Sequence, residues 1–211
     1  MPARYVVVAG NIGAGKSSLV KWLDKTFGFA PFYEPHEDNP YLADFYGDMR
    51  RWAFSSQLFF LTRRFRMQRE LERALGVTSA RGVVLDRSLY EDAEVFAAYL
   101  HEAGHIDTRD WRTYRDLYEG LRAELTTPDL LVYLRCPVRV LRKRIRARGR
   151  GYEQAIPNSY LKSLDRLYEQ WFAGYTASPT LVVDTSEVDY VEDLFHRKAL
   201  IEAIEGAIGR P

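Results

Sequence analysis

The segment from Gly10 to Ser17 has the residue types and the spacing of a phosphate-binding loop. It reads G-N-I-G-A-G-K-S, which fits the pattern of Gly, four residues, Gly, Lys and then Ser or Thr. Glycines at these points allow positive φ and let backbone N–H groups approach a polyphosphate, and the helix that follows adds its partial positive charge. The residues expected to bind ATP here are Gly10, Asn11, Ile12, Gly13, Ala14, Gly15, Lys16, Ser17 and Ser18.

Two side chains of this loop have a defined chemistry. Lys16 is expected to reach the outer phosphates, and the Ser17 hydroxyl is expected to ligate Mg²⁺. A glycine-rich turn that only ends or begins a helix would explain Gly10 or Gly15, but it would not explain the Lys-Ser pair. The loop therefore predicts a nucleotide site and leaves the phosphate acceptor open.

Charged side chains follow two of the expected strands. Glu34 closes the second short apolar run, and Asp86 and Arg87 follow the third. Ligands bind at the carboxyl edge of a parallel sheet, so all three side chains are candidates for the site. Glu34 is either a base for the acceptor proton or an ordinary loop acid, and Asp86 is a Mg²⁺ ligand, a base or a helix cap. Arg87 is suited to bind both Glu34 and a moving phosphate.

The segment from Arg135 to Arg150 contains eight Arg or Lys residues and no acidic residue. Arg144 and Arg148 lie one helical turn apart, and Arg150 follows Gly149, which can bend the chain. A solvated basic helix is the plain alternative. Beside a phosphate loop, the run favours an arginine-rich lid that covers the phosphates of ATP.

Five short apolar runs alternate with longer stretches of helical pattern. The runs lie at 5–9, 31–33, 82–85, 130–134 and 180–183. Segments such as Val6-Val7-Val8 and Leu130-Leu131-Val132 are apolar throughout, as expected of strands covered on both faces of a parallel sheet. Helical patterns lie at 16–27, 51–75, 89–100, 111–125, 138–146, 159–175 and 191–208. The order predicts a doubly wound α/β fold, a five-stranded parallel sheet flanked by helices.

Composition limits the remaining classes. The 211 residues suit a single domain, and 30 basic against 29 acidic residues give no global charge for a nucleic-acid polymer or a membrane surface. No apolar run approaches the roughly 20 residues of a membrane helix. Cys136 is the single cysteine, and no signal segment precedes the first run, so we expect a cytoplasmic protein.

Four segments together resemble the signature segments of the deoxyribonucleoside kinase family. They are Gly10–Ser18, Glu34-Pro35, Asp86-Arg87-Ser88 and Arg144–Glu153, in the family's order. The resemblance spans nearly the whole chain and is closest to bacterial deoxyadenosine/deoxyguanosine kinases. It implies a P-loop kinase with a lid at about 144–156, ATP as donor, Mg²⁺, a homodimer, and transfer of the γ-phosphate to the 5′-hydroxyl of a deoxynucleoside in nucleotide salvage.

The resemblance also implies an acceptor pocket. Its substrate-binding residues would be Glu34, Leu42, Tyr46, Gln57, Arg64, Arg87, Asp92, Phe96 and Glu153, and its catalytic residues Glu34, Asp86 and Arg87. Relatives often carry Glu in place of Asp86, so the division of base and metal roles between Glu34 and Asp86 stays open. Glu187 and Asp189 lie in the loop that would cover the adenine of ATP.

Base choice rests on Gln57 and Asp92. Together they could bind an exocyclic amine and its neighbouring ring nitrogen, a pattern that adenine and cytosine present. We expect deoxyadenosine or deoxycytidine as acceptor, with deoxyguanosine as a further candidate. Ala93 stands where relatives carry Arg beside this Asp.

Two other functions share part of this pattern. A nucleoside monophosphate kinase resembling thymidylate kinase also joins a P-loop to Glu-Pro and Asp-Arg, but here acidic residues follow Glu-Pro, which disfavours an acceptor phosphate. A non-catalytic nucleotide-binding regulatory module would not need the acceptor residues. The four histidines show no metal-binding spacing with Cys136.

Overall fold

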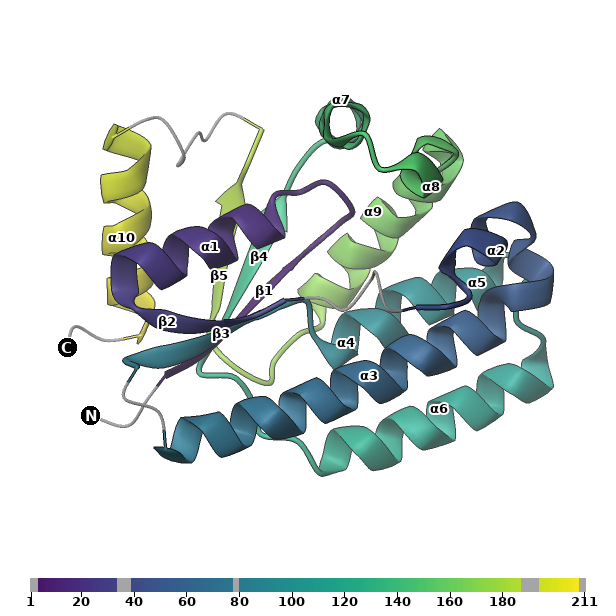
Figure 1. Cartoon of the computed structure of the whole chain (residues 1–211), viewed down its shortest axis with the longest axis horizontal. Coiled ribbons are helices and arrows are strands. Elements are labelled where there is room, and N and C mark those ends of the chain that lie inside the picture. Colours follow the sequence, from purple (N-terminus) through teal and green to yellow (C-terminus); the bar gives the residue numbers. More distant parts are fainter. Residues whose placement is uncertain (1–3, 34–38, 78–79, 187–193, 209–211) are drawn as a thin grey trace.

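The computed structural model describes residues 4–33, 39–77, 80–186 and 194–208. Within these residues no helix is both long and apolar enough to cross a membrane. The chain forms one parallel sheet with helices on both faces (Figure 1). This arrangement confirms the predicted α/β fold.

All five strands of the sheet run parallel, in the order β2-β3-β1-β4-β5. They are β1 (Arg4–Gly10), β2 (Phe29–Phe32), β3 (Gly82–Asp86), β4 (Leu130–Arg135) and β5 (Thr180–Asp184). The central strand β1 is buried almost throughout, which explains why it is apolar at consecutive positions. Because every strand points the same way, the residues that follow β1, β2 and β3 are brought to one edge of the sheet.

Helices cover the two faces of the sheet unequally. One face packs on α1 (Lys16–Phe27) and α10 (Leu194–Ile208), and the other packs on α9 (Asn158–Ala173). Helix α3 (Met49–Val77) also packs on this second face, where its Leu71 belongs to the same buried cluster, and α6 (Thr108–Ala123) runs beside α3 in Figure 1. The remaining helices are α2 (Leu42–Gly47), α4 (Leu89–Glu91), η1 (Asp92–Ala97), α5 (Ala98–Glu102), α7 (Val138–Arg148) and α8 (Gly151–Gln154).

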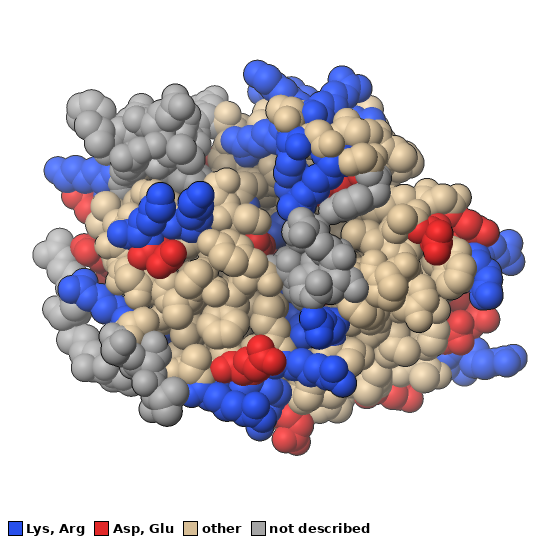
Figure 2. Space-filling view, viewed as in Figure 1, with Lys and Arg blue, Asp and Glu red and all other residues tan. Residues whose placement is uncertain are grey.

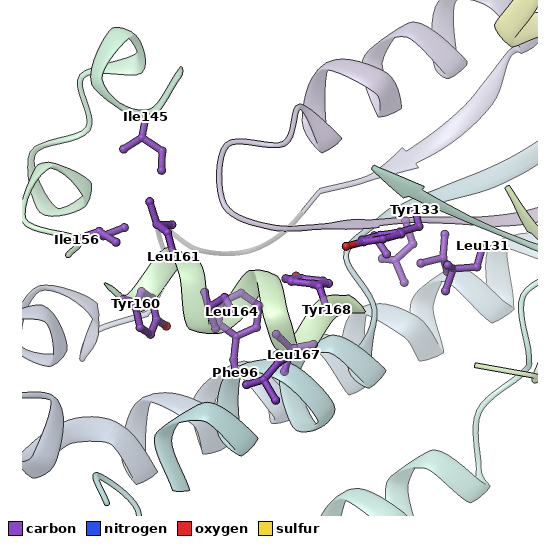
Figure 3. Close-up of a cluster of buried hydrophobic side chains, with 14 of the residues drawn as sticks. Phe96, Leu131, Tyr133, Ile145, Ile156, Tyr160, Leu161, Leu164, Leu167 and Tyr168 are labelled. Carbon is purple, nitrogen blue, oxygen red and sulfur yellow. The ribbon is translucent and has the colours of Figure 1, made fainter. Parts of the chain in front are cut away.

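The largest buried cluster joins the sheet to the arginine-rich segment. Figure 3 shows α9 side chains such as Leu161 and Tyr168 between Tyr133 of β4 and Ile145 of α7. Ile156, which follows α8, belongs to the same cluster. The helix that carries the lid arginines is therefore anchored by its apolar stripe, while its basic side chains gather on the surface (Figure 2).

The elements differ from the predicted ones mainly where no long periodic pattern exists. Helix α2 was missed because six residues are too few to establish a helical period. The predicted helix at 89–100 is instead three consecutive pieces, with the π-helical segment η1 between two α-helical turns. Helix α6 begins three residues early, since the Asp107 carboxylate accepts a hydrogen bond from the Asp110 N–H as an N-cap.

Candidate active site

The backbone of the phosphate loop requires its glycines. Gly10, Gly13 and Gly15 all have positive φ, of 147°, 83° and 103°. A Cβ on Gly10 would lie 2.8 Å from the carbonyl oxygen of Leu134, and one on Gly13 would lie 3.1 Å from Cγ1 of Ile145 in α7. The first glycine thus lets the loop leave the sheet, and the second lets the arginine-rich helix pack directly on the loop.

Side chains of the loop hold its shape from within. The Asn11 amide donates to the carbonyl of Leu161 in α9 at 3.1 Å, and its oxygen accepts from the Ile12 N–H at 2.8 Å. Lys16 is nearly buried, and its Nζ donates to the carbonyl oxygens of Gly10 and Asn11 at 2.9 and 3.2 Å. The ammonium group therefore lies within the loop. Ser17 and Ser18 are exposed in the first turn of α1.

Asp86 faces the phosphate loop across the sheet edge. Its Oδ2 accepts a hydrogen bond from Ser17 Oγ at 2.5 Å, while its buried Oδ1 accepts none from any described residue. A hydroxyl and a carboxylate side by side, with one buried oxygen left over, are the oxygen donors that Mg²⁺ prefers. These two residues fit the predicted metal role. Among the described residues no group of three or more His, Cys, Asp and Glu side chains could hold a metal.

Arg87 has a strained backbone conformation. Its φ of 67° is the single positive value at a non-glycine residue in the described part of the chain, and its N–H donates to the carbonyl of Val8 at 3.0 Å. The guanidinium lies 4.3 Å from the ring centre of Phe96, a cation–π contact. The turn thus directs Arg87 toward the predicted acceptor residues of η1.

A buried ion pair organises the predicted base pocket. Arg64 of α3 is fully buried, and its Nε donates to Oδ2 of Asp92 at 2.5 Å. Its Nη1 also donates to the carbonyl of Arg87 at 3.1 Å. Gln57, two turns earlier on α3, is 4% exposed. Arg64 therefore contributes to the site indirectly, because its side chain holds the Asp92 carboxylate and the Arg87 carbonyl in fixed positions.

The predicted sugar-binding residues come from short helices. Leu42 and Tyr46 lie on α2, and Glu153 lies on α8, which contacts α2. Leu42 and Glu153 are buried, while Tyr46 is partly buried against the core. Burial, and next the neighbouring Tyr46, raise the pKa of Tyr160 well above its usual value, so Tyr160 is a neutral phenol at this end of the site.

The three lid arginines have two kinds of partner. Arg144 is bound to backbone and a hydroxyl: it donates to the carbonyls of Ala14 and Thr185 at 3.3 and 2.6 Å, and to Thr185 Oγ1 at 3.1 Å. Arg148 donates to Oε2 of Glu153 at 2.6 and 3.0 Å, and Arg150 pairs with its Oε1 at 3.4 Å. Arg144 thus ties the phosphate loop to the end of β5, whereas the other two converge on the predicted sugar carboxylate.

Cys136 lies beside the Arg144 anchor. Its Sγ is 3.5 Å from Nη1 of Arg144. Burial raises the pKa of the thiol, although a hydrogen bond with Thr185 and the charge of Arg144 act in the opposite direction. The thiol is therefore a buried packing group, with no sign of an activated nucleophile.

Three predicted site residues, Glu34, Glu187 and Asp189, lie outside the described residues. The other predicted residues gather along the carboxyl edge of the sheet and on the helices beside it. The residues that contact them without having been predicted include two buried polar side chains: Glu91, which accepts from the Gly10 N–H, and Thr185, which accepts from Arg144. A signal for Glu91 exists, since Ser88-Leu89-Tyr90-Glu91 has the spacing of a capping box. We find no comparable signal for Thr185.

Known proteins resemble this chain over nearly its full length. The family model described as "Deoxynucleoside kinase" matches residues 6–209. The chain is 35% identical to a deoxyadenosine/deoxycytidine kinase of Bacillus subtilis, over 96% of this chain and 92% of that protein. It is 38% identical to a deoxyguanosine kinase of Lactobacillus acidophilus, over 94% and 88% of the two chains. A solved structure of deoxyadenosine kinase from M. mycoides with bound dCTP superposes with a TM-score of 0.82 at 28% identity, covering 96% of this chain and 99% of that one.

Proposed function

Because the chain belongs to the deoxynucleoside kinase family, we propose that it phosphorylates deoxyadenosine or deoxycytidine, with deoxyguanosine as a further acceptor. Membership confirms the resemblance indicated by the four sequence segments. It also confirms the reaction class, ATP-dependent phosphoryl transfer to a deoxynucleoside, over the monophosphate kinase and the regulatory module. The choice of base and the roles of single residues are the content of the proposal.

The observation that carries the base choice is the buried pair of Arg64 and Asp92. The Asp92 carboxylate accepts a hydrogen bond from Arg64, and its oxygens are acceptors that a base could use. An exocyclic amine, present on adenine and cytosine, is the donor that this acceptor fits, while Gln57 can bind the adjacent ring nitrogen. The B. subtilis relative is named for these two bases, and the M. mycoides kinase is described with dCTP bound. The L. acidophilus relative is a deoxyguanosine kinase, which is why deoxyguanosine stays in the proposal.

Phosphoryl transfer would use the residues at the sheet edge. The 5′-oxygen forms a bond to the γ-phosphorus as the bond to the bridging oxygen of ADP breaks, and the hydroxyl proton passes to Glu34 or Asp86. Lys16, Arg87, Arg148 and Arg150 would stabilise the charge on the transferring group. Arg144, through Ala14 and Thr185, would hold the donor site in shape.

Mg²⁺ would be held by Ser17 and Asp86, consistent with the unused buried oxygen of Asp86. When bound, it would neutralise phosphate charge. If Asp86 is a metal ligand, Glu34 is the stronger candidate for the base, since one carboxylate does not serve both roles well.

We further propose a cytoplasmic homodimer built from single-domain subunits, with the lid at about 144–156. The homodimer rests on the family, while the near-neutral charge of the chain, 30 basic against 29 acidic residues, gives no sign of a nucleic-acid or membrane-surface partner. Light scattering of the purified protein would give the mass of a dimer of 24.5 kDa chains if it is correct.

The test of base choice is the kcat/KM of the wild type and of Asp92→Asn for each deoxynucleoside. Asn can donate as well as accept, and it leaves Arg64 without its charge partner. We expect the variant to lose about 10- to 100-fold in kcat/KM with deoxyadenosine and deoxycytidine, as for the loss of one bidentate base contact. An equal loss with all four deoxynucleosides would contradict base recognition by Asp92.

A further inference from the structure

Glu91 is a fully buried carboxylate that was not among the predicted site residues. Its side chain has no solvent exposure, and it ends the short helix α4. It accepts four hydrogen bonds from three separate parts of the chain. The donors are the Gly10 N–H at 3.1 Å, the Tyr168 hydroxyl at 2.9 Å, and the N–H and hydroxyl of Ser88 at 2.8 and 3.1 Å.

The two backbone donors require an acceptor oxygen at each end of the Glu91 carboxyl group. Oε1 faces the backbone N–H of Gly10, and Oε2 faces the backbone N–H of Ser88. A backbone N–H can only donate, so each side-chain atom at these two points must be an acceptor. In a glutamine, the amide NH₂ group would face one of the two backbone N–H groups, whichever way the amide is turned. A capping box uses one such contact, so the second backbone contact is additional to capping.

The two backbone groups belong to opposite halves of the site. Gly10 is the first residue of the phosphate loop, where φ is 147° and no Cβ is tolerated. Ser88 follows Arg87, whose φ of 67° is strained, and Glu91 also lies 3.9 Å from Nε of Arg87. A strained turn persists only where its surroundings hold it. One buried carboxylate therefore fixes the loop that binds the donor to the turn that carries Arg87.

We propose that Glu91 is a positioning residue, which sets the distance between the phosphate loop and Arg87 so that both reach the same phosphoryl group. The inference deepens the proposed function and rests on it, because it assigns to Arg87 a role in phosphoryl transfer. Tyr168 completes the arrangement from α9, in the cluster that also packs on the lid helix (Figure 3). Glu91 touches neither substrate in this account and acts through Gly10 and Arg87.

The first experiment compares Glu91→Gln with Glu94→Gln in steady-state kinetics. Glu94 lies three residues further along the chain, is partly exposed, and pairs with Arg115 of α6 away from the loop. We expect Glu91→Gln to lower kcat by about 10²-fold, the cost of a misalignment near 1 Å, with each KM within about threefold of the wild type. Glu94→Gln should leave both constants unchanged. A kcat for Glu91→Gln within threefold of the wild type would overturn the proposal.

A double-mutant comparison with Arg87→Ala shows whether Glu91→Gln lowers kcat by displacing Arg87 or by disturbing the whole site. If Glu91 acts through Arg87, the double variant should be no more than about threefold slower than the slower single variant. Losses in kcat that multiply would overturn the proposal. If Arg87→Ala alone keeps its kcat, the role of Arg87 in the proposed function fails, which is a different result from a failure of Glu91→Gln.

Tyr168→Phe keeps the proposal testable if Glu91→Gln does not fold. The substitution removes one hydrogen bond to Glu91 and keeps the ring in its cluster. We expect kcat to fall about three- to tenfold, in line with the loss of one hydrogen bond, while the melting temperature shows that the variant is folded. An unchanged kcat in the folded Tyr168→Phe variant would overturn the proposal.

Discussion

The donor half and the acceptor half of this site are built in different ways. The phosphate loop is a run of consecutive residues whose function resides in its backbone: three glycines with positive φ and a helix that begins at Lys16. The acceptor half is built from side chains distant in sequence, above all Arg64 and Asp92, which meet as a buried ion pair across 28 positions. Local chain geometry specifies the first half, and tertiary packing specifies the second.

This difference explains what each half can tolerate. The phosphate loop binds a group common to all nucleoside triphosphates, so its geometry is restricted at every residue. The acceptor half must distinguish bases, and a few buried charges with compensated partners can do so within the same fold. Side-chain substitutions should therefore act mainly on catalysis in the donor half, and on both stability and specificity in the acceptor half. A Cβ added to the backbone of the phosphate loop should also lower stability.

The largest expected effect is a loss of stability caused by a substitution in the acceptor half. Arg64→Met leaves the Asp92 carboxylate buried without its partner, and the free energy of unfolding should fall by about 3–5 kcal/mol. Replacing both residues, as Arg64→Met with Asp92→Leu, should restore most of that stability while acceptor binding stays lost. Urea unfolding and the KM for deoxyadenosine measure the two properties. A double variant as unstable as the single one would show that the pair does not act as a unit.

The second-largest expected effect is a loss of catalytic activity caused by a substitution in the donor half. Lys16→Ala removes the ammonium group within the loop and should lower kcat/KM by about 10³-fold, as for loss of a preorganised electrostatic contact. Lys21→Ala, at an exposed position of the same helix, is the matched control and should retain wild-type activity. Wild-type activity in Lys16→Ala would remove Lys16 from the proposed chemistry.

The donor half and the acceptor half act together when the 5′-hydroxyl of the acceptor loses its proton. Glu34→Gln should lower kcat by at least about 10²-fold with little change in the KM for ATP, because the amide cannot take the proton from the 5′-hydroxyl. Asp86→Asn, measured in parallel with varied Mg²⁺, should instead raise the Mg²⁺ concentration needed for half-maximal rate. A near-normal kcat for Glu34→Gln would assign the base to Asp86.

The smallest effect concerns the backbone of the loop. Gly10→Ala places a Cβ 2.8 Å from the Leu134 carbonyl and should lower the free energy of unfolding by about 1–3 kcal/mol. Gly120→Ala, in the exposed interior of α6 with nothing near its Cβ, should raise it by about 0.5–1 kcal/mol. Thermal unfolding of the two variants gives the comparison. An equal melting temperature for both would contradict the steric account of the loop.

The fold could be predicted from sequence because its signals are local. Each strand is a short apolar run, and α1 was predicted with the bounds that it has in the structure. Helix α2 was missed because it is too short to show a period, and the π-helical segment η1 leaves no distinct pattern in sequence. These elements carry Tyr46, Asp92 and Phe96, so the poorly predicted elements are also those that shape the acceptor half.

The donor half of the candidate site could be predicted from the residues alone, whereas the acceptor half could not. The residue types and spacing from Gly10 to Ser17 specify the donor loop without any relative. Gln57 and Arg64 have no such signal, since a polar residue on a long helix is ordinarily solvated, and only the family resemblance identified them. That Arg64 is buried against Asp92 depends on how α3 packs on η1, which no local pattern reports.

The most direct test of the two-part site is one assay of the purified enzyme with ATP, Mg²⁺ and separate acceptors. The acceptors are the four deoxynucleosides and their 5′-monophosphates, and the phosphorylated products are identified by mass. The account predicts the highest kcat/KM with deoxyadenosine or deoxycytidine and no turnover of any monophosphate. Turnover of monophosphates alone, or thymidine as the best acceptor, would contradict it.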